Sequence, residues 1–186
     1  MYNQKEVTGE IFNIQGFSIH VGPGIRTVIF ALCKERGLHT AIETCGFGSW
    51  NNFSKILAHT DLVLYDFKHM DSEQHKAGTG VGNELILENA VRICKEAKKN
   101  LIARVPVIPD LNDTESNMKA LAEFILHKLE QPVKVHLLPY HQLGESKISH
   151  LEKTEERTQV APPSDAHMES LRSIVAGYGL EVIIGG

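Results

Sequence analysis

Short apolar runs alternate with longer stretches of helical periodicity along almost the whole chain. Continuous apolar runs are typical of strands buried on both faces, and their alternation with helices predicts parallel strands joined by helical crossovers. The predicted strands are residues 27–30, 39–44, 62–67, 101–107, 133–138 and 181–184. With 186 residues, the chain is expected to form a single α/β domain over residues 1–186.

Four helices are expected between these strands. One runs from Ser49 to about residue 59, one follows Asn83, one begins near Thr114 or Ser116, and one begins near Asp165. In the last three, apolar residues recur at intervals of three and four, which is the spacing of a core-facing stripe. The stripes are Leu87, Ala90, Val91, Cys94 and Ala97; Met118, Leu121, Ala122, Ile125 and Leu129; and Met168, Leu171, Val175 and Tyr178.

The junction after Phe30 conflicts with this pattern. Only residues 31–38 separate the first two predicted strands, and this segment ends at Gly37, a natural helix stop. A crossover between parallel strands needs at least about 10–12 residues. We therefore expect that sequence is absent near residues 30–31; the alternative is that the first strand pairs elsewhere or stays loose.

Composition excludes several classes of protein. The net charge is −4, from 19 basic and 23 acidic residues, with no block of one sign, so a nucleic-acid-binding surface is not expected. No apolar run approaches the ~20 residues of a membrane span, and the first residues lack a signal-peptide layout. Three scattered cysteines fit neither a disulfide framework nor a cysteine-rich metal module. These features favour a cytoplasmic protein, which we expect to be a monomer without a membrane partner.

Ionisable residues gather where the predicted strands end. Ligands bind at the carboxyl ends of parallel strands, because the strand-to-helix loops meet there. The residues at these ends are Glu43, Thr44, Asp66, Lys68, Arg104, Tyr140 and His141. Lys68 and Arg104 suit a carboxylate, and the acids suit an amine or another cation, so the set could hold a zwitterion. The alternative is a structural ion-pair network around a barrel mouth.

Other polar features give weaker signals. Gly22-Pro23-Gly24, followed by Arg26, fixes a tight exposed backbone that could contact a ligand or another chain, although any turn before a strand has this form. Cys45 could be a nucleophile, but no base is identifiable. Five histidines lack a partner at metal-ligand spacing and are expected at the surface. They are His59, His75, His127, His150 and His167.

Five segments, in this order, resemble the glycyl-radical-enzyme activating enzymes of the pyruvate formate-lyase activating type, within the radical-SAM superfamily. They are FNIQGFSIHVGPGIRTVIF, CKERGLHTAIETCGF, LVLYDFKHMD, ARVPVIPDLND and HLLPYHQLGESK. The resemblance implies a partial (β/α) barrel, a [4Fe-4S] cluster and S-adenosylmethionine as cofactors, and an oxidoreductase reaction. In that reaction, hydrogen is abstracted from a glycine of a glycyl-radical enzyme, the protein substrate.

The resemblance also assigns residues. It places Lys68, Arg104 and His141 around S-adenosylmethionine. Glu43, Thr44 and Asp66 align with family residues near the same cofactor, although aspartate is the commoner acid at the first position. Gly22, Gly24 and Arg26 match the segment beside the cluster and the substrate peptide.

The chain departs from the family where the cofactor should be anchored. The three-cysteine cluster loop that follows the first strand is absent, as is the Gly-Gly-Glu segment, and Val21 replaces the usual aspartate. The cysteines lie at positions 33, 45 and 94, too far apart for a local cluster loop. We therefore expect a barrel with about one β/α unit missing that is inactive as a radical generator. The alternatives are a non-enzymatic remnant that binds a glycyl-radical enzyme or S-adenosylmethionine, and a non-functional fragment.

Overall fold

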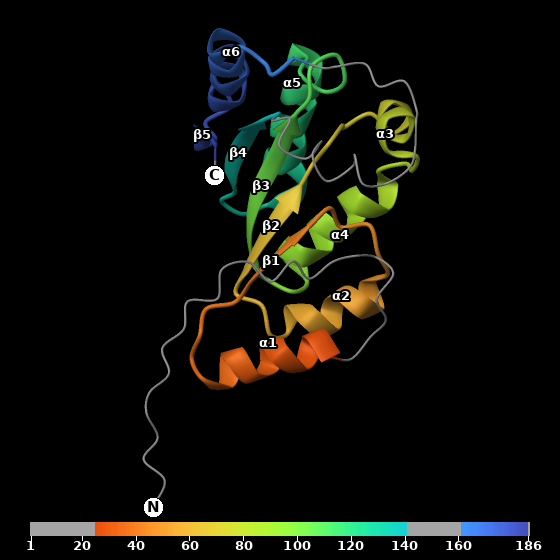
Figure 1. Ribbon diagram of the computed structural model, residues 1–186, viewed down its shortest axis with the longest axis vertical. Helices are drawn as coiled ribbons and strands as arrows, with labels where there is room; N and C mark the ends of the chain where they lie inside the picture. Colours follow the sequence, from red (N-terminus) through yellow and green to blue (C-terminus); the bar gives the residue numbers. More distant parts are fainter. Residues whose placement is uncertain (1–24, 141–160, 186) are drawn as a thin grey trace, which may run out of the picture.

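The computed structural model describes residues 25–140 and 161–185. Its centre is one parallel sheet whose strands follow one another in chain order (Figure 1). The strands are β1 (Ala41–Thr44), β2 (Leu62–Asp66), β3 (Asn100–Val107), β4 (Lys134–Pro139) and β5 (Val182–Ile184). The predicted α/β class is confirmed. Within the described ranges the sheet stays open, with β1 and β5 at its edges, so the barrel is partial.

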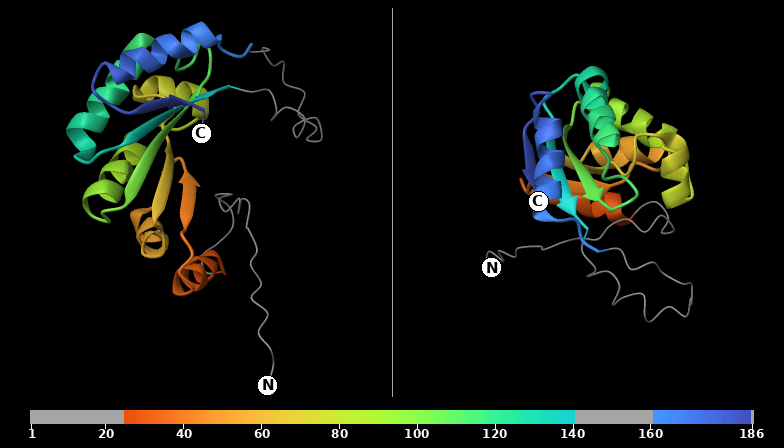
Figure 2. Two further views of the ribbon diagram at one scale, coloured as in Figure 1. Left: turned by 90° about the vertical axis from the view of Figure 1, so that its left-hand side faces the viewer. Right: turned by 90° about the horizontal axis from the view of Figure 1, so that it is seen from above.

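The helices lie around the outside of the curved sheet (Figure 2). They are α1 (Ile25–Glu35), α2 (Trp50–Leu57), α3 (Ser72–Thr79), α4 (Glu84–Lys95), α5 (Glu115–Phe124), which continues into the π-helix η1 (Ile125–Leu129), and α6 (Asp165–Ala176). Each β-to-β connection is thus a helical crossover, as parallel pairing requires.

Alternate residues of the strands face this helical layer, and we call that side of the sheet the outer face. Its side chains are almost completely buried; Val63, Ala103, Val105 and Leu137 are at most 1% exposed. The helices contribute matching apolar stripes. All five stripe residues predicted for α5 and η1 are buried, whereas in α4 the buried stripe is centred one position earlier, on Ile86 and Ile93, and Leu87 and Val91 are only partly buried.

The predicted strand at residues 27–30 is wrong, because this segment belongs to helix α1. A strand here would have to join the free edge of β1, and the connection is too short for a parallel crossover. A single helix that runs to Glu35 needs no turn after Phe30, and Gly37, with φ of +73°, follows its end as predicted. The crossover conflict that suggested missing sequence therefore does not arise in this fold.

Helix α1 is held to the sheet by an ion pair between Lys34 and Asp61. The Asp61 carboxylate also accepts hydrogen bonds from the Thr40 N–H (3.0 Å) and hydroxyl (3.1 Å). The lysine contact and these hydrogen bonds hold the pKa of Asp61 well below its usual range. Across the described ranges, no helix combines the length and the apolarity that crossing a membrane requires.

Candidate functional site

The concave side of the sheet, which we call the inner face, carries the strand residues that alternate with the buried ones. None of its residues is fully buried, and charged side chains stand among aliphatic ones. On β1 to β4 it presents Glu43, Leu62, Leu64, Asp66, Ile102, Arg104, Pro106, His136 and Leu138. A sheet with one face packed and one face bearing charges is suited to binding a polar ligand on the second face.

Three of these residues form a charge triad. The Arg104 guanidinium lies 2.8 Å from Glu43 Oε2 and 3.5 Å, through Nε, from Asp66 Oδ1. Arg104 and Asp66 are register partners on neighbouring strands, so the parallel pairing itself brings them together. The side chains of Asp66 and Arg104 are 16% and 18% exposed, whereas that of Glu43 is 58% exposed. The convergence predicted for these three residues is present.

Asp66 is the unusual member of the triad. Its Oδ1 atom is buried and, among the described residues, receives no hydrogen bond; Arg104 Nε lies 3.5 Å away, beyond the usual range for an N–H···O bond. Burial raises the pKa of Asp66, and the charges of Arg104 and Lys68 only partly offset that effect. A buried carboxylate oxygen without a donor favours a ligand that brings one, such as an ammonium group.

Lys68 lies near Asp66 but not on the same strand. β2 ends at Asp66 rather than at the predicted residue 67, so Lys68 stands in the loop that leads to α3. The two side chains therefore do not share a strand face, although the Lys68 charge lowers the pKa of Asp66. No salt bridge within the described ranges engages Lys68, while Arg104 is paired with two carboxylates. Among the described residues near the triad, Lys68 is thus a cation available for a ligand carboxylate.

Thr44 does not belong to this group. It is buried on the outer face, because neighbours along a strand point to opposite sides, and its hydroxyl oxygen accepts from the Gly46 N–H (3.0 Å). His141, Gly22 and Gly24 lie outside the described residues. Arg26 falls within α1, outside the range whose side chains are described.

His136 is an inner-face residue that the sequence did not assign to the site. It is the register partner of Arg104 on β4. Partial burial, with the charges of Arg104 and Lys134, lowers its pKa, so this imidazole favours the neutral form. The alternation of side chains along a strand could have identified His136, because it faces the same side of the sheet on β4 as Arg104 does on β3.

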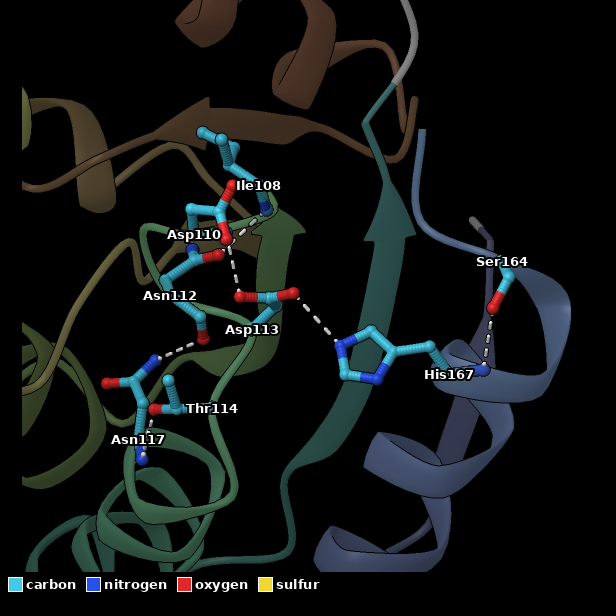
Figure 3. A network of polar contacts seen from close by, with 8 residues as sticks. All are labelled: Ile108, Asp110, Asn112, Asp113, Thr114, Asn117, Ser164 and His167. Atoms are coloured by element: carbon cyan, nitrogen blue, oxygen red, sulfur yellow. Dashed lines mark hydrogen bonds and ion pairs between the residues drawn. The ribbon is translucent and has the colours of Figure 1, made fainter. Parts of the chain in front are cut away.

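Two histidines expected at the surface are not free there. His75 is 3% exposed, and its Nδ1 lies 2.7 Å from the Val81 carbonyl oxygen. His167 Nε2 lies 3.0 Å from Asp113 Oδ2, which joins α6 to the β3–α5 loop (Figure 3). Both histidines join one element or loop to another.

The cysteines do not fit the iron–sulfur cluster that the family resemblance implies. Cys33 lies on α1, Cys45 follows β1 and Cys94 lies on α4. Burial raises the pKa of the Cys94 thiol to about 11, whereas a cluster ligand must be a thiolate. Over residues 25–140 and 161–185, no three side chains from His, Cys, Asp and Glu gather closely enough to hold a metal ion.

Comparisons with known proteins agree with one another. The chain is 40% identical to a 4-hydroxyphenylacetate decarboxylase activating enzyme of Clostridioides difficile over 154 residues, 82% of this chain and 48% of that protein. It is 34% identical to a choline trimethylamine-lyase activating enzyme of Oleidesulfovibrio alaskensis over 183 residues, 96% of this chain and 58% of that protein. The chain thus spans about half the length of the curated relatives it matches.

A solved structure is similar over nearly its whole length. A domain of pyruvate-formate lyase-activating enzyme from Bacteroides vulgatus superposes with a TM-score of 0.71 at 31% identity, covering 86% of this chain and 89% of that one. No family model matches the chain.

Proposed function

Because the chain belongs to the family of glycyl-radical-enzyme activating enzymes, we propose that its inner face binds the amino-acid end of S-adenosylmethionine without generating a radical. Members of this family are radical-SAM proteins that use S-adenosylmethionine and a [4Fe-4S] cluster. The family's reaction, hydrogen abstraction from a glycine of a partner enzyme, is proposed for longer relatives of this chain rather than for the chain itself.

The Asp66 oxygen, which has no hydrogen-bond donor among residues 25–140 and 161–185, carries the binding proposal. The triad has two negative charges and one positive charge, and Lys68 brings the local sum to zero. A ligand ammonium can donate to Asp66, while its carboxylate pairs with Lys68, so a zwitterion leaves the sum unchanged. Arg104 then acts mainly by holding the two carboxylates in place, rather than by binding the ligand carboxylate as its residue type suggests.

Calorimetric titration of S-adenosylmethionine tests this proposal. Wild-type protein is expected to release or absorb measurable heat, and Lys68→Ala to weaken the affinity about tenfold or more, the size of one charge-assisted contact. Lys128→Ala is the matched control, because Lys128 is exposed on η1 and outside the site. Absence of heat from wild-type protein would refute the proposal.

The second half of the proposal concerns the cluster. The separation of the three cysteines and the protonated state of Cys94 support a chain that holds no [4Fe-4S] cluster. Anaerobic reconstitution with iron and sulfide is expected to leave the protein without iron. About four irons per chain with charge-transfer absorbance would contradict this half.

The proposal also covers the partner of the chain and the segment that it lacks. We propose that the chain acts as a cytoplasmic monomer, that its glycyl-radical-enzyme partner contacts Gly22, Gly24 and Arg26, and that the family's cluster loop is missing near residues 30–31. The resemblance of the segment FNIQGFSIHVGPGIRTVIF to the family supports the contacts of Gly22, Gly24 and Arg26. The absence of the three-cysteine motif after Phe30 supports the missing loop. A pull-down with a purified glycyl-radical enzyme tests docking: Arg26→Ala should reduce capture, and equal capture would exclude this surface.

A further inference from the structure

The loop that carries Lys68 is held by buried asparagine side chains. Residues 67–71 connect β2 to α3 at the edge of the sheet where the charge triad lies. Asn83, Asn112 and Asn117 are at most 5% exposed, and each contacts the main chain of this loop. A buried amide must find partners for its donors and its acceptor, so each of these contacts is geometrically demanding.

Asn112 makes the contact closest to the site. Its Nδ2 donates to the carbonyl oxygen of Lys68 (2.6 Å) and to that of Pro106 (2.8 Å). Its Oδ1 accepts from the Ile108 N–H (2.7 Å), a bond drawn in Figure 3. Asn112 itself is fully buried, while the residues that it bonds are partly buried. One side chain thus joins the main chain of Lys68 to the end of β3, the strand that bears Arg104.

Asn117 holds the same loop two residues further along. Its Oδ1 accepts from the Met70 N–H (2.9 Å). Its Nδ2 donates to the carbonyl oxygen of Asn112 (2.9 Å), and Figure 3 draws this second bond. Asn83 begins α4 but makes no side-chain capping bond there. It donates instead to the carbonyl oxygens of His69 (2.9 Å) and Met70 (2.8 Å). The main chain from Lys68 to Met70 is therefore fixed at every residue.

We propose that Asn112 is a positioning residue that sets the Lys68 ammonium group beside Asp66. With its main chain anchored, the Lys68 ammonium group can move only through the side-chain torsions of Lys68, which limits the positions that it can reach around Asp66. The inference deepens the proposed function, because it names the residue on which carboxylate recognition by Lys68 depends. Asn112 touches no ligand in this scheme; its effect passes through Lys68.

Asn89 offers a matched control of the same residue type. It is 1% exposed, and its Nδ2 donates to the carbonyl oxygens of Gly46 and Gly48, both at 2.8 Å. It thus holds the loop after β1 as Asn112 holds the loop after β2. A role in stability alone is common to both asparagines, whereas coupling to Lys68 is expected only for Asn112.

A double-mutant cycle on S-adenosylmethionine affinity tests the inference. Asn112→Ala is expected to weaken binding about tenfold when Lys68 is present and to have no further effect in the Lys68→Ala protein. Asn89→Ala should change affinity equally in both backgrounds. Equal losses for Asn112→Ala in both backgrounds would overturn the inference. If Asn112→Ala does not fold, Asn112→Ser, which retains a polar group for the Ile108 N–H, takes its place in the cycle.

The Asp66 pKa provides a readout without any ligand, so failure of the proposed function is distinguishable from failure of the inference. Carbon NMR titration of labelled aspartate is expected to show a raised pKa for Asp66 in Lys68→Ala and in Asn112→Ala, with no further rise in the double variant. The charges that face Asp66 are Arg104, Lys68 and Glu43. An unchanged Asp66 pKa in Asn112→Ala would refute the positioning role, whether or not S-adenosylmethionine binds.

Discussion

The two faces of the sheet are built from the same strands yet behave differently. On β3, Ala103, Val105 and Val107 are at most 1% exposed beneath the helices. The intervening residues Arg104 and Pro106 are only partly buried, on the inner face. The outer face supplies the apolar burial that drives folding. The inner face adds little to that burial, and in the described part of the chain it leaves a carboxylate oxygen of Asp66 without a donor.

This difference indicates where the chain can change without unfolding. Substitutions on the outer face create cavities in a packed core, whereas those on the inner face alter charge in a partly hydrated surface. A family can therefore keep its fold through one face while its chemistry is kept or lost on the other. The following predictions test that separation in order of decreasing effect.

The largest difference is expected between two neighbours on β4. Leu137 is fully buried on the outer face, and Leu138 is half-buried on the inner face. Leu137→Ala should lower the free energy of unfolding by about 3 kcal/mol, because it leaves a cavity, and Leu138→Ala by less than about 1 kcal/mol. Urea denaturation measures both. Equal losses would show that the inner face is packed as tightly as the outer one.

Gly46 tests the outer layer at the end of β1. Its φ is +76°, and an added Cβ would lie 1.6 Å from Tyr65 Oη, which donates to the Ile86 carbonyl oxygen. Gly46→Ala should therefore cost about 2 kcal/mol or more, from backbone strain together with displaced packing. Gly37 is the control for strain alone, because its φ is +73° and an added Cβ would meet no atom of the described residues within 4 Å. Similar decreases in melting temperature for Gly46→Ala and Gly37→Ala would contradict a packing contribution at Gly46.

Asp66→Asn is expected to change how stability depends on pH. Burial raises the Asp66 pKa in the folded state, so stability is fully present below the unfolded pKa and is lost as pH rises through the folded one. The side-chain amide of the Asp66→Asn variant does not ionise, so the variant does not lose this stability as pH rises. The stability of Asp66→Asn relative to wild type should therefore increase from about pH 3 upward. A difference that does not change with pH would mean that the Asp66 pKa is normal.

His136 should give the smallest effect. Its pKa is lowered in the folded protein, so the stability linked to neutral His136 is lost as pH falls through the unfolded value near 6.5. Because the side chain is largely hydrated, the loss is small. His136→Gln should be slightly less sensitive to pH between about 7 and 5 than wild type. A greater sensitivity in the variant would contradict the sign of the shift.

The sequence predicts the sheet well because buried parallel strands are continuous apolar runs. The segments around Val63, Val105 and Leu137 are such runs, and their strands begin and end within two residues of the predicted limits. Residues 27–30 show its limit. Their β-branched and aromatic side chains favour a strand locally, but the short connection to β1 leaves such a strand no place in the sheet.

The site was only partly predictable. Strand ends identify Glu43, Asp66 and Arg104, because register brings them to one edge. Alternation should have excluded Thr44, which is adjacent to Glu43 and so faces the helices. The asparagine contacts could not have been found, since Asn112 and Lys68 are 44 positions apart and their bond depends on how two loops pack.

Recognition of the zwitterion by Asp66 and Lys68 is the claim on which the functional account depends. The most direct test compares, by calorimetry on the wild-type chain, S-adenosylmethionine with 5′-methylthioadenosine, which shares the nucleoside and sulfur but lacks the amino-acid group. The account predicts that S-adenosylmethionine binds at least about tenfold more tightly. Equal affinities for the two ligands, or tighter binding of 5′-methylthioadenosine, would contradict it.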